Sequence, residues 1–151
     1  MHIRKAETTD LIAIVEMIAN DKLGSKREDF QIPLPKKYNE AFERIAADPY
    51  QELVVLENAD HKVIGTLQLS FVQYLTYQGG IRAQIEQVRI HESQRGKGLG
   101  KLLFNWAIDR AKQRGAHLVQ LTTDKKRPDA LRFYESLGFK ASHEGMKLHL
   151  G

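Results

Sequence analysis

Apolar and polar residues recur along this chain with two different periods. In residues 63–71 apolar side chains alternate with polar ones, which predicts a half-buried strand. In residues 11–18 and 99–110 apolar side chains recur three or four positions apart, which predicts amphipathic helices. With glycine and proline marking the turns, strands are predicted at 3–6, 53–56, 63–71, 83–90, 118–122, 139–141 and 146–150. Helices are predicted at 11–18, 38–47, 98–114 and 128–137, and 22–37 is a loop or a broken helix.

This succession of elements predicts the fold class. The order β-α-α-β-β-β-α-β-α-β-β indicates an α/β protein with a central mixed sheet and helices on both faces. The chain has 151 residues and shows no internal repeat, low-complexity tract or linker. We therefore expect a single domain spanning residues 1–151.

Composition and charge narrow the class of protein. With 42% hydrophobic and 28% charged residues, the chain suits a globular fold rather than disorder. The net charge of +4 raises the question of nucleic acid, but Lys and Arg are interleaved with Asp and Glu, and no helix-turn-helix, zinc-finger or RNP pattern accompanies them. No window approaches the roughly 18 apolar residues of a membrane span, and no secretory signal is visible. We expect a cytoplasmic protein that binds neither nucleic acid nor membrane.

Residue types also limit the chemistry. The absence of cysteine excludes a thiolate nucleophile and a thiolate metal site. The six histidines show no metal-ligand spacing, so no metal is expected. His91 is interpreted as a surface turn residue rather than a proton-transfer group.

The most informative segment is 94–101, with the sequence QRGKGLGK. Its three glycines, at alternate positions, let the backbone approach a ligand closely, and the following helix directs free N–H groups and a positive dipole end into the loop. These features favour a phosphate-bearing anion. The spacing is one residue short for a P-loop, Leu102 replaces its hydroxyl residue, and the dinucleotide pattern G-x-G-x-x-G is not matched. The structural alternative is a glycine-rich turn with a solvated basic face.

A second motif follows at 130–139, where ALRFYESLGF matches A-x-x-F-Y-E-x-L-G-F. The glycine loop matches the pattern Q/R-x-x-G-x-G/A through Arg95, Gly98 and Gly100. With these two motifs in this order, the chain resembles the GNAT superfamily of acyl-CoA-dependent N-acetyltransferases. The resemblance covers nearly the whole order of elements and is most specific from residue 85 to residue 139.

The resemblance implies acetyl-CoA as the cosubstrate. Its pyrophosphate is expected on the N–H groups of the glycine loop, and its pantetheine arm beside a strand backbone. Arg127 stands where the family often has asparagine, and an arginine there could reach a phosphate instead. The cofactor-binding residues expected on this basis are Val88, Arg89, Ile90, Arg95, Gly96, Lys97, Gly98, Leu99, Gly100, Lys101 and Arg127.

Acetyl transfer to an amine requires a proton acceptor for the ammonium and a proton donor for the departing thiolate. By resemblance, Tyr134 is the expected general acid, and the N–H of Val88 polarises the thioester carbonyl. Glu86, flanked by apolar Ile85 and followed by Gln87 and Val88, is the expected general base, acting through a water. The structural alternatives are a core aromatic residue for Tyr134 and an exposed or salt-bridged strand residue for Glu86.

The acceptor amine is expected at the segments 23–37 and 74–80. The aromatic residues Phe30, Tyr38, Tyr74 and Tyr77 would line a cation site, serve ordinary packing or form a dimer contact. Nearby acidic residues that would suit a cationic acceptor are Glu28, Asp29 and Glu52.

These residues support an N-acetyltransferase that moves the acetyl group of acetyl-CoA to a primary amine of a small molecule or peptide. Without a cysteine nucleophile, the amine is expected to attack directly within a ternary complex. Two alternatives stay open: a CoA-binding regulatory module that has lost catalysis, and a nucleic-acid-binding regulator. A homodimer is compatible with the sequence, which does not decide it.

Overall fold

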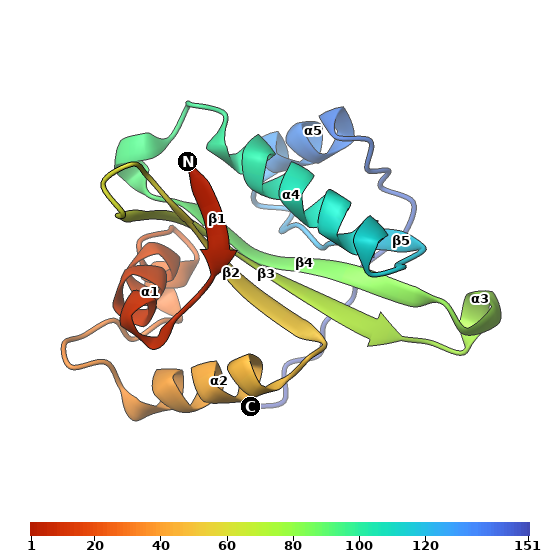
Figure 1. Cartoon of the computed structure of the whole chain (residues 1–151). Coiled ribbons are helices and arrows are strands. Elements are labelled where there is room, and N and C mark those ends of the chain that lie inside the picture. Colours follow the sequence, from red (N-terminus) through yellow and green to blue (C-terminus); the bar gives the residue numbers. More distant parts are fainter. The chain divides into compact units, whose positions relative to one another are not determined.

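The computed structural model describes residues 1–151 as two compact units, 1–120 and 121–151, which are taken separately here. The first unit is built on a five-stranded sheet with the order β1-β2-β3-β4-β5 (Figure 1). Neighbouring strands are antiparallel except for β4 and β5, which are parallel, so the sheet is mixed. Its strands are β1 (His2–Lys5), β2 (Gln51–Glu57), β3 (Val63–Gln73), β4 (Ile81–Ile90) and β5 (Leu118–Gln120).

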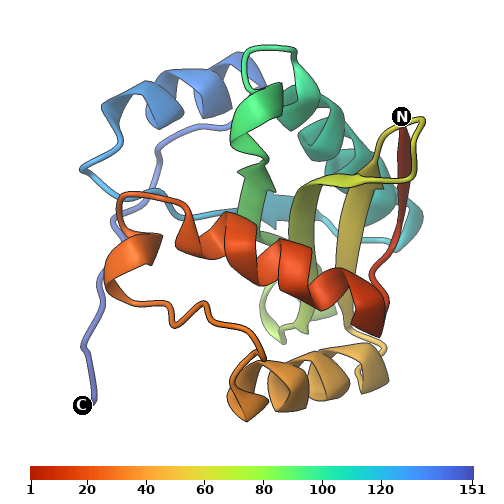
Figure 2. The same ribbon diagram turned by 90° about the vertical axis from the view of Figure 1, so that its left-hand side faces the viewer.

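Helices cover both faces of this sheet, as the sequence predicts. Helices α1 (Leu11–Ala19) and α2 (Lys36–Ala47) lie on one face, and α4 (Leu99–Gln113) lies on the other (Figures 1 and 2). A single turn, α3 (Thr76–Gly79), closes the β3–β4 hairpin. The remaining helical turns are the 3-10 segments η1 (Thr8–Asp10), η2 (Gly24–Lys26) and η3 (Glu92–Gln94).

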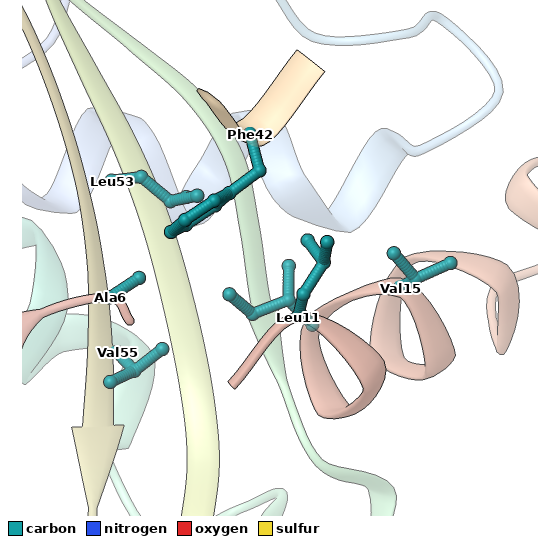
Figure 3. Packing of buried hydrophobic residues seen from close by; sticks show 7 residues of the cluster. Ala6, Leu11, Val15, Phe42, Leu53 and Val55 are labelled. Carbon is teal, nitrogen blue, oxygen red and sulfur yellow. The ribbon is translucent and has the colours of Figure 1, made fainter. Parts of the chain in front are cut away.

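The α1/α2 face of the sheet carries one apolar cluster. Leu11 and Val15 of α1 and Phe42 of α2 pack with Leu53 and Val55 of β2 (Figure 3). All five are at least nine-tenths buried, and each such side chain contributes about 1.5–3 kcal/mol through removal from water. The apolar periodicity of the two helices therefore matches the face that each one buries.

The α4 face is held by packing and by charge. Leu103 is fully buried and lies over Gly65 of β3, where a Cβ would come within 3.3 Å of its side chain. Glu52 of β2 accepts hydrogen bonds from Arg110 (2.8 Å) and Arg114 (2.7 Å) of the helix end. Because these bonds fix Glu52 beneath α4, on the face opposite α1 and α2, its expected role with a cationic acceptor is wrong.

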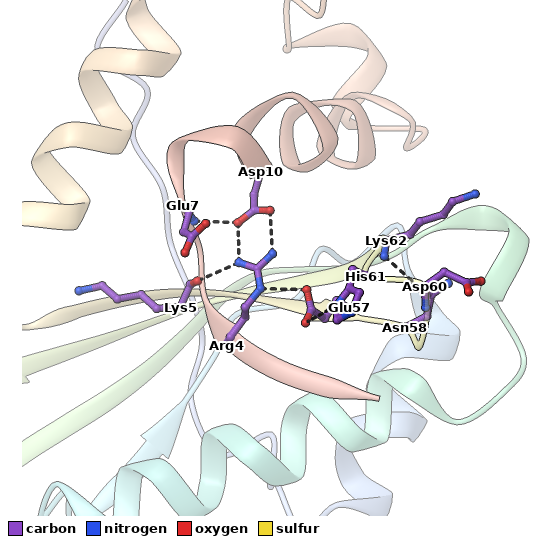
Figure 4. Close-up of polar contacts among 9 residues, drawn as sticks. All are labelled: Arg4, Lys5, Glu7, Asp10, Glu57, Asn58, Asp60, His61 and Lys62. Carbon is purple, nitrogen blue, oxygen red and sulfur yellow. Dashed lines mark hydrogen bonds and ion pairs between the residues drawn. The ribbon is translucent and has the colours of Figure 1, made fainter.

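A partly buried ion-pair network joins β1, β2 and the turn before α1. Arg4 donates to both carboxylate oxygens of Asp10, at 2.8 and 3.0 Å, and to Glu57 at 2.9 Å (Figure 4). Asp10 also accepts from the amide of Glu7 at 2.7 Å. Burial tends to raise the pKa of Asp10, but the hydrogen bonds from Arg4 and from the Glu7 amide outweigh it and hold that pKa below its ordinary value of 3.8.

The second unit contains α5 (Pro128–Ser136) and irregular chain. Proline at the first helical position suits the helix start, and Gly138, at φ 97°, reverses the chain after its end. The strands predicted at 139–141 and 146–150 are not formed, which corrects the last two elements of the predicted order. The alternating Met146, Leu148 and Leu150 are 86–94% exposed. Apolar alternation suits a pleated, half-buried surface, but a strand also needs a partner strand, which the alternation does not supply.

Helix length and hydropathy also bear on membranes. None of the helices is both long enough and apolar enough to pass through a lipid bilayer.

We expect the Arg4–Asp10 contact to make folding sensitive to acid. Asp10→Asn should lower the free energy of unfolding at pH 7 by about 2 kcal/mol, because a charge-assisted hydrogen-bond pair is weakened. The folded-state pKa of Asp10 is depressed, so the contribution of the carboxylate is complete above the unfolded-state pKa and is lost as the pH falls through the folded-state value. The difference between the two proteins in urea unfolding should therefore shrink as the pH falls below the ordinary Asp value of 3.8 and through the lower folded-state pKa.

Asp60→Asn is the matched control, because Asp60 is exposed in the nearby hairpin turn and is part of none of these ion pairs. It should change the free energy of unfolding by less than about 0.5 kcal/mol. A difference for Asp10→Asn that stays constant across the acid range would contradict the assignment.

Candidate functional site

The glycine loop between β4 and α4 has left-handed backbone at two of its glycines. Gly96 has φ 79°, and Gly98, the N-cap of α4, has φ 76°. A Cβ added at either position would meet no atom within 4 Å. Backbone handedness, rather than lack of space, therefore requires glycine here, and the space in front of the loop is open.

The amide groups of this loop are available to a ligand. None of the N–H groups from Gly96 to Lys101 donates to a backbone carbonyl, and the first such bond at the helix start runs from Leu102 to Gly98. Leu99 is buried and anchors the first turn of α4, so only its backbone can serve the loop. Free amides at the positive end of a helix dipole form an anion site, which fits the diphosphate of a CoA thioester.

Cationic side chains surround the same amides. Arg95, Lys97 and Lys101 are exposed, and Lys97 donates to Gln94 at 3.1 Å. These side chains add positive charge at the rim of the loop, where it attracts an anion over a longer range than the amides do.

Strands β4 and β5 pair over a short distance only. Their parallel register runs from Arg82 opposite Leu118 to Gln84 opposite Gln120. Beyond Gln84 no strand pairs with this edge of β4, including the residues Val88–Ile90. An unpaired strand edge can accept an extended ligand chain that carries amide groups, as the pantetheine arm does.

A β-bulge interrupts β4 opposite β3. Thr66 pairs with Arg89 and Gln68 pairs with Glu86, so Gln87 and Val88 together face the single residue Leu67. Gln87 adopts the left-handed region at φ 59°. The extra residue places the side chains of Glu86 and Arg89 on the same face of the sheet, although their spacing of three predicts opposite faces. Nothing in the sequence indicated this bulge, because its left-handed residue is not a glycine.

Glu86 lies in a polar row on the α1/α2 face. Its carboxylate is exposed and accepts a hydrogen bond from Gln84 at 2.6 Å. Gln84 in turn accepts from Gln120 of β5 at 3.2 Å. Ile85 is buried on the other face of the sheet. The neighbouring apolar residue in the sequence therefore does not surround the carboxylate of Glu86. Solvent can reach this carboxylate, as a base that works through a water requires.

Arg89 extends its side chain toward the segment that follows α1. Its Nη2 lies 3.4 Å from Oδ2 of Asp21, and its Nη1 donates to the carbonyl of Val88 at 2.8 Å. The two charged side chains are 17% and 16% exposed. The expected pantetheine contact of Arg89 therefore concerns its backbone, while its side chain reaches Asp21, which precedes the segment 23–37.

His91 has a structural role at the start of η3. Its Nδ1 accepts from the amide of Ser93 at 3.2 Å, which confirms the interpretation as a turn residue. The ring also borders a cavity of about 30 Å³, which has room for one or two water molecules rather than for a substrate. The other residues lining it are Glu16, Met17, Asn20, Ile90, Glu92 and Arg95.

The four aromatic residues considered for a cation site do not come together. Tyr74 and Tyr77 flank the guanidinium of Arg82, with its carbon 4.3 and 5.7 Å from the ring centroids. Phe30 and Tyr38 pack instead against the α1/α2 core. Tyr74 and Tyr77 thus bind a cation of the chain itself, and Phe30 and Tyr38 serve packing, while a dimer contact stays a prediction. No three His, Asp or Glu side chains are grouped so that they could hold a metal ion.

In the second unit, Tyr134 lies on α5 within an aromatic group. Its ring centroid is 5.7 Å from that of Phe133 and 6.3 Å from that of Phe139. The amide of Phe139 donates to the carbonyl of Tyr134 at 3.1 Å, and the left-handed Gly138 allows this return of the chain. Arg127 is the N-cap residue of the same helix. The second motif therefore specifies a short helix with its C-terminal cap, while the catalytic role of Tyr134 stays a prediction.

Comparisons with known proteins agree with this geometry. The model of the Acetyltransferase (GNAT) family matches residues 16–139. An aminoalkylphosphonate N-acetyltransferase from Salmonella typhimurium is 30% identical over 142 residues, covering 93% of this chain and 86% of that protein. An L-methionine sulfoximine/L-methionine sulfone acetyltransferase from Pseudomonas aeruginosa is 28% identical, covering 93% and 80%.

A solved structure described as a transcriptional regulator from Bacillus halodurans C-125 is 56% identical, covers 99% of each chain and has a TM-score of 0.96. The likeness to this structure confirms the predicted α/β fold. The strands predicted at 139–141 and 146–150 are the exception, because this chain does not form them. Because the family model spans most of the chain and the Salmonella relative aligns along nearly all of it, this protein belongs to the acetyltransferase (GNAT) family.

Proposed function

We propose that this protein transfers the acetyl group of acetyl-CoA to the primary amine of a small molecule. The family uses acetyl-CoA, and the named relatives are an N-acetyltransferase and an acetyltransferase. The observation that carries the proposal is the run of free amides from Gly96 to Lys101 at the start of α4, beside an unpaired edge of β4. The test is an assay of thiol release from acetyl-CoA with a panel of amines.

In this proposal the diphosphate binds to the amides of the glycine loop. Arg95, Lys97 and Lys101 add positive charge, and Arg127 contributes a further phosphate contact. The backbone of Val88, Arg89 and Ile90 pairs with the pantetheine arm along the edge of β4. When bound, acetyl-CoA supplies an activated acetyl thioester.

Three groups of the chain then serve the transfer. Glu86 accepts, through a water, the proton that the ammonium must lose before its nitrogen can attack the thioester carbonyl. The N–H of Val88 stabilises the negative charge that develops on the carbonyl oxygen. As the carbon–sulfur bond breaks, Tyr134 donates its phenolic proton to the thiolate, because a phenol with a pKa near 10 is protonated at neutral pH. The acetyl group passes directly to the amine, since the chain has no cysteine to carry it.

The acceptor proposed is a small amine. The Salmonella relative is named for aminoalkylphosphonates and the Pseudomonas relative for derivatives of methionine, so both names specify small amines rather than proteins. The family match runs through both compact units, which supports a single catalytic domain over residues 1–151. A cytoplasmic location and a homodimer belong to the same proposal.

A second candidate function is nucleic-acid binding, favoured by the description of the Bacillus halodurans structure as a transcriptional regulator. The charges of this chain favour it less. Arg4, Arg89, Arg110 and Arg114 lie against carboxylates, which offsets much of their positive charge. Titration with acetyl-CoA and with duplex DNA separates the candidates, and binding of DNA without acetyl-CoA would favour the regulator. Binding of acetyl-CoA without turnover of any amine would favour a regulatory module.

Gly98→Ala should weaken the binding of CoA, measured by isothermal titration calorimetry, by about tenfold. A Cβ in the left-handed conformation costs about 1–2 kcal/mol. If the backbone shifts to relieve this strain, the amides of the loop turn away from the diphosphate. Gly115→Ala is the matched control, because Gly115 also has φ 76° but lies just beyond the other end of α4. Equal losses of CoA affinity in both variants would argue against the loop as the diphosphate site.

Tyr134→Phe should lower kcat by about 10²-fold while the KM for acetyl-CoA stays nearly unchanged, because only the proton donor is lost. Steady-state thiol release provides both constants. Tyr50→Phe, at a tyrosine that is 57% exposed, is the control and should behave as the wild type. An unchanged kcat would remove Tyr134 from the mechanism.

Glu86→Gln should lower kcat/KM for the amine by about 10²-fold at pH 7. The deficit should narrow as the pH approaches about 10, where free amine forms without a base. Glu40→Gln, on the outer side of α2, is the control for the loss of one carboxylate. A deficit that is the same at every pH would reject Glu86 as the base.

A further inference from the structure

Two chains of hydrogen-bonded amide side chains lie on the α1/α2 face of the sheet, and one of them ends on Glu86. Gln120 of β5 donates to Gln84 of β4 at 3.2 Å, and Gln84 donates to Oε1 of Glu86 at 2.6 Å. We propose that Gln84 is a positioning residue that holds the carboxylate of Glu86 in place for proton transfer. This inference rests on the proposed acetyl transfer and adds a residue that acts through its base.

The strand register brings these three side chains together. Gln84 and Glu86 are two residues apart on β4, so their side chains project from the same face of the sheet. Gln84 pairs with Gln120 in the parallel register, which places the third side chain beside them. Gln84 and Gln120 are half-buried, whereas Glu86 is exposed. Two partly enclosed amides therefore hold a carboxylate that solvent can reach.

The chemistry of the carboxylate fixes the direction of this chain. An ionised carboxylate only accepts hydrogen bonds, so Gln84 must turn the NH2 group of its amide toward Glu86. This orientation leaves the carbonyl oxygen of Gln84 as the acceptor for Gln120. Each bond polarises the next, so the pair of amides binds the carboxylate more strongly than one amide would.

One oxygen of the carboxylate is left for the reaction. Gln84 binds Oε1 of Glu86, and no protein group donates to Oε2. An exposed glutamate without a partner samples several rotamers, and only some of them place an oxygen against a water beside the acceptor amine. The bond from Gln84 restricts these rotamers before the amine arrives, which raises the fraction of molecules in the reactive geometry.

The second chain on this face provides an internal comparison. Gln68 of β3 donates to Gln51 of β2 at 2.6 Å, and Gln51 donates to Asp48 at 3.1 Å. Gln68 lies opposite Glu86 in the register, yet its amide is bonded toward β2 instead. Asp48, the carboxylate at the end of this chain, has no part in the proposed transfer. Gln51 therefore has the same place in its chain as Gln84, without a contact to the base.

The structural alternative is that Gln84 and Gln120 only fasten β5 to β4. These two strands pair over a short register, so a side-chain bond between them would help to hold the edge of the sheet. A purely structural role would affect activity independently of Glu86. This difference makes the two roles separable by experiment.

Gln84→Met tests the proposal, because methionine keeps the length of the side chain and removes its donor. At pH 7, kcat for the amine should fall about tenfold, while the KM for acetyl-CoA stays within about twofold. The deficit should narrow as the pH approaches about 10, where free amine forms without a base. Steady-state thiol release across this pH range provides the measurement. Gln51→Met is the matched control and should keep the wild-type kcat and pH profile.

A double variant separates positioning from the structural role. If Gln84 acts through Glu86, adding Gln84→Met to Glu86→Gln should lower kcat by less than about twofold more. A further loss of the full tenfold would assign Gln84 the structural role. Gln120→Met should lower kcat about threefold, because Gln84 then keeps its bond to the carboxylate but loses its own support. If Gln84→Met fails to fold, Gln120→Met decides, alone and combined with Glu86→Gln.

The outcomes distinguish this inference from the proposed function. A wild-type kcat in Gln84→Met, an equal loss in Gln51→Met, or a deficit that is the same at every pH would overturn the inference and leave acetyl transfer intact. A wild-type kcat in Glu86→Gln would overturn it together with the assignment of the base. A protein that neither binds acetyl-CoA nor acetylates any amine would refute the proposed function itself.

Discussion

The bulge at Gln87 and Val88 is the constraint on which the rest of the candidate site depends. One extra residue in β4 bends the strand and changes which side chains share a face. The pairing of β4 with β5 has already ended at Gln84, so the bulged segment offers its backbone to a ligand on one edge. The same segment carries Glu86 and Arg89 on the face toward α1. The bulge thus sets which side chains share a face, and the unpaired edge beside it comes from the early end of the β4–β5 pairing.

Charged and apolar contacts hold both faces of the sheet around this bulge. Arg4 joins β1, β2 and the turn before α1, and Glu52 joins β2 to the end of α4. The apolar cluster of α1 and α2 covers one side, and Leu103 covers Gly65 on the other. A strained residue such as Gln87 persists only where its surroundings fix it in this way.

The distribution of positive charge explains how a basic chain can suit a small anion. Several arginines are used for internal ion pairs, so part of the positive charge behind the net +4 is offset within the fold. Arg95, Lys97 and Lys101 stay exposed around the free amides of the glycine loop. Three cationic side chains therefore stand where the amide groups already favour a phosphate.

The sequence by itself determined the elements whose signals are local. The helices at 11–18 and 38–47, the helix start at Gly98 and the cap at Gly138 follow from side-chain periodicity and backbone preference within a few residues. The two motifs were sufficient to identify the family, and the glycine loop has the geometry expected for it. The catalytic roles of Tyr134 and Glu86 stay predictions.

Tertiary structure alone decided what depends on pairing between distant residues. The bulge places Glu86 and Arg89 together, and no nearby residue type signals it, because strand register is set across the sheet. Glu52 looked available for a substrate until α4 brought two arginines to it. The apolar alternation of 146–150 resembles a strand, yet the segment forms none, because a strand exists only where a neighbouring backbone completes its hydrogen bonds.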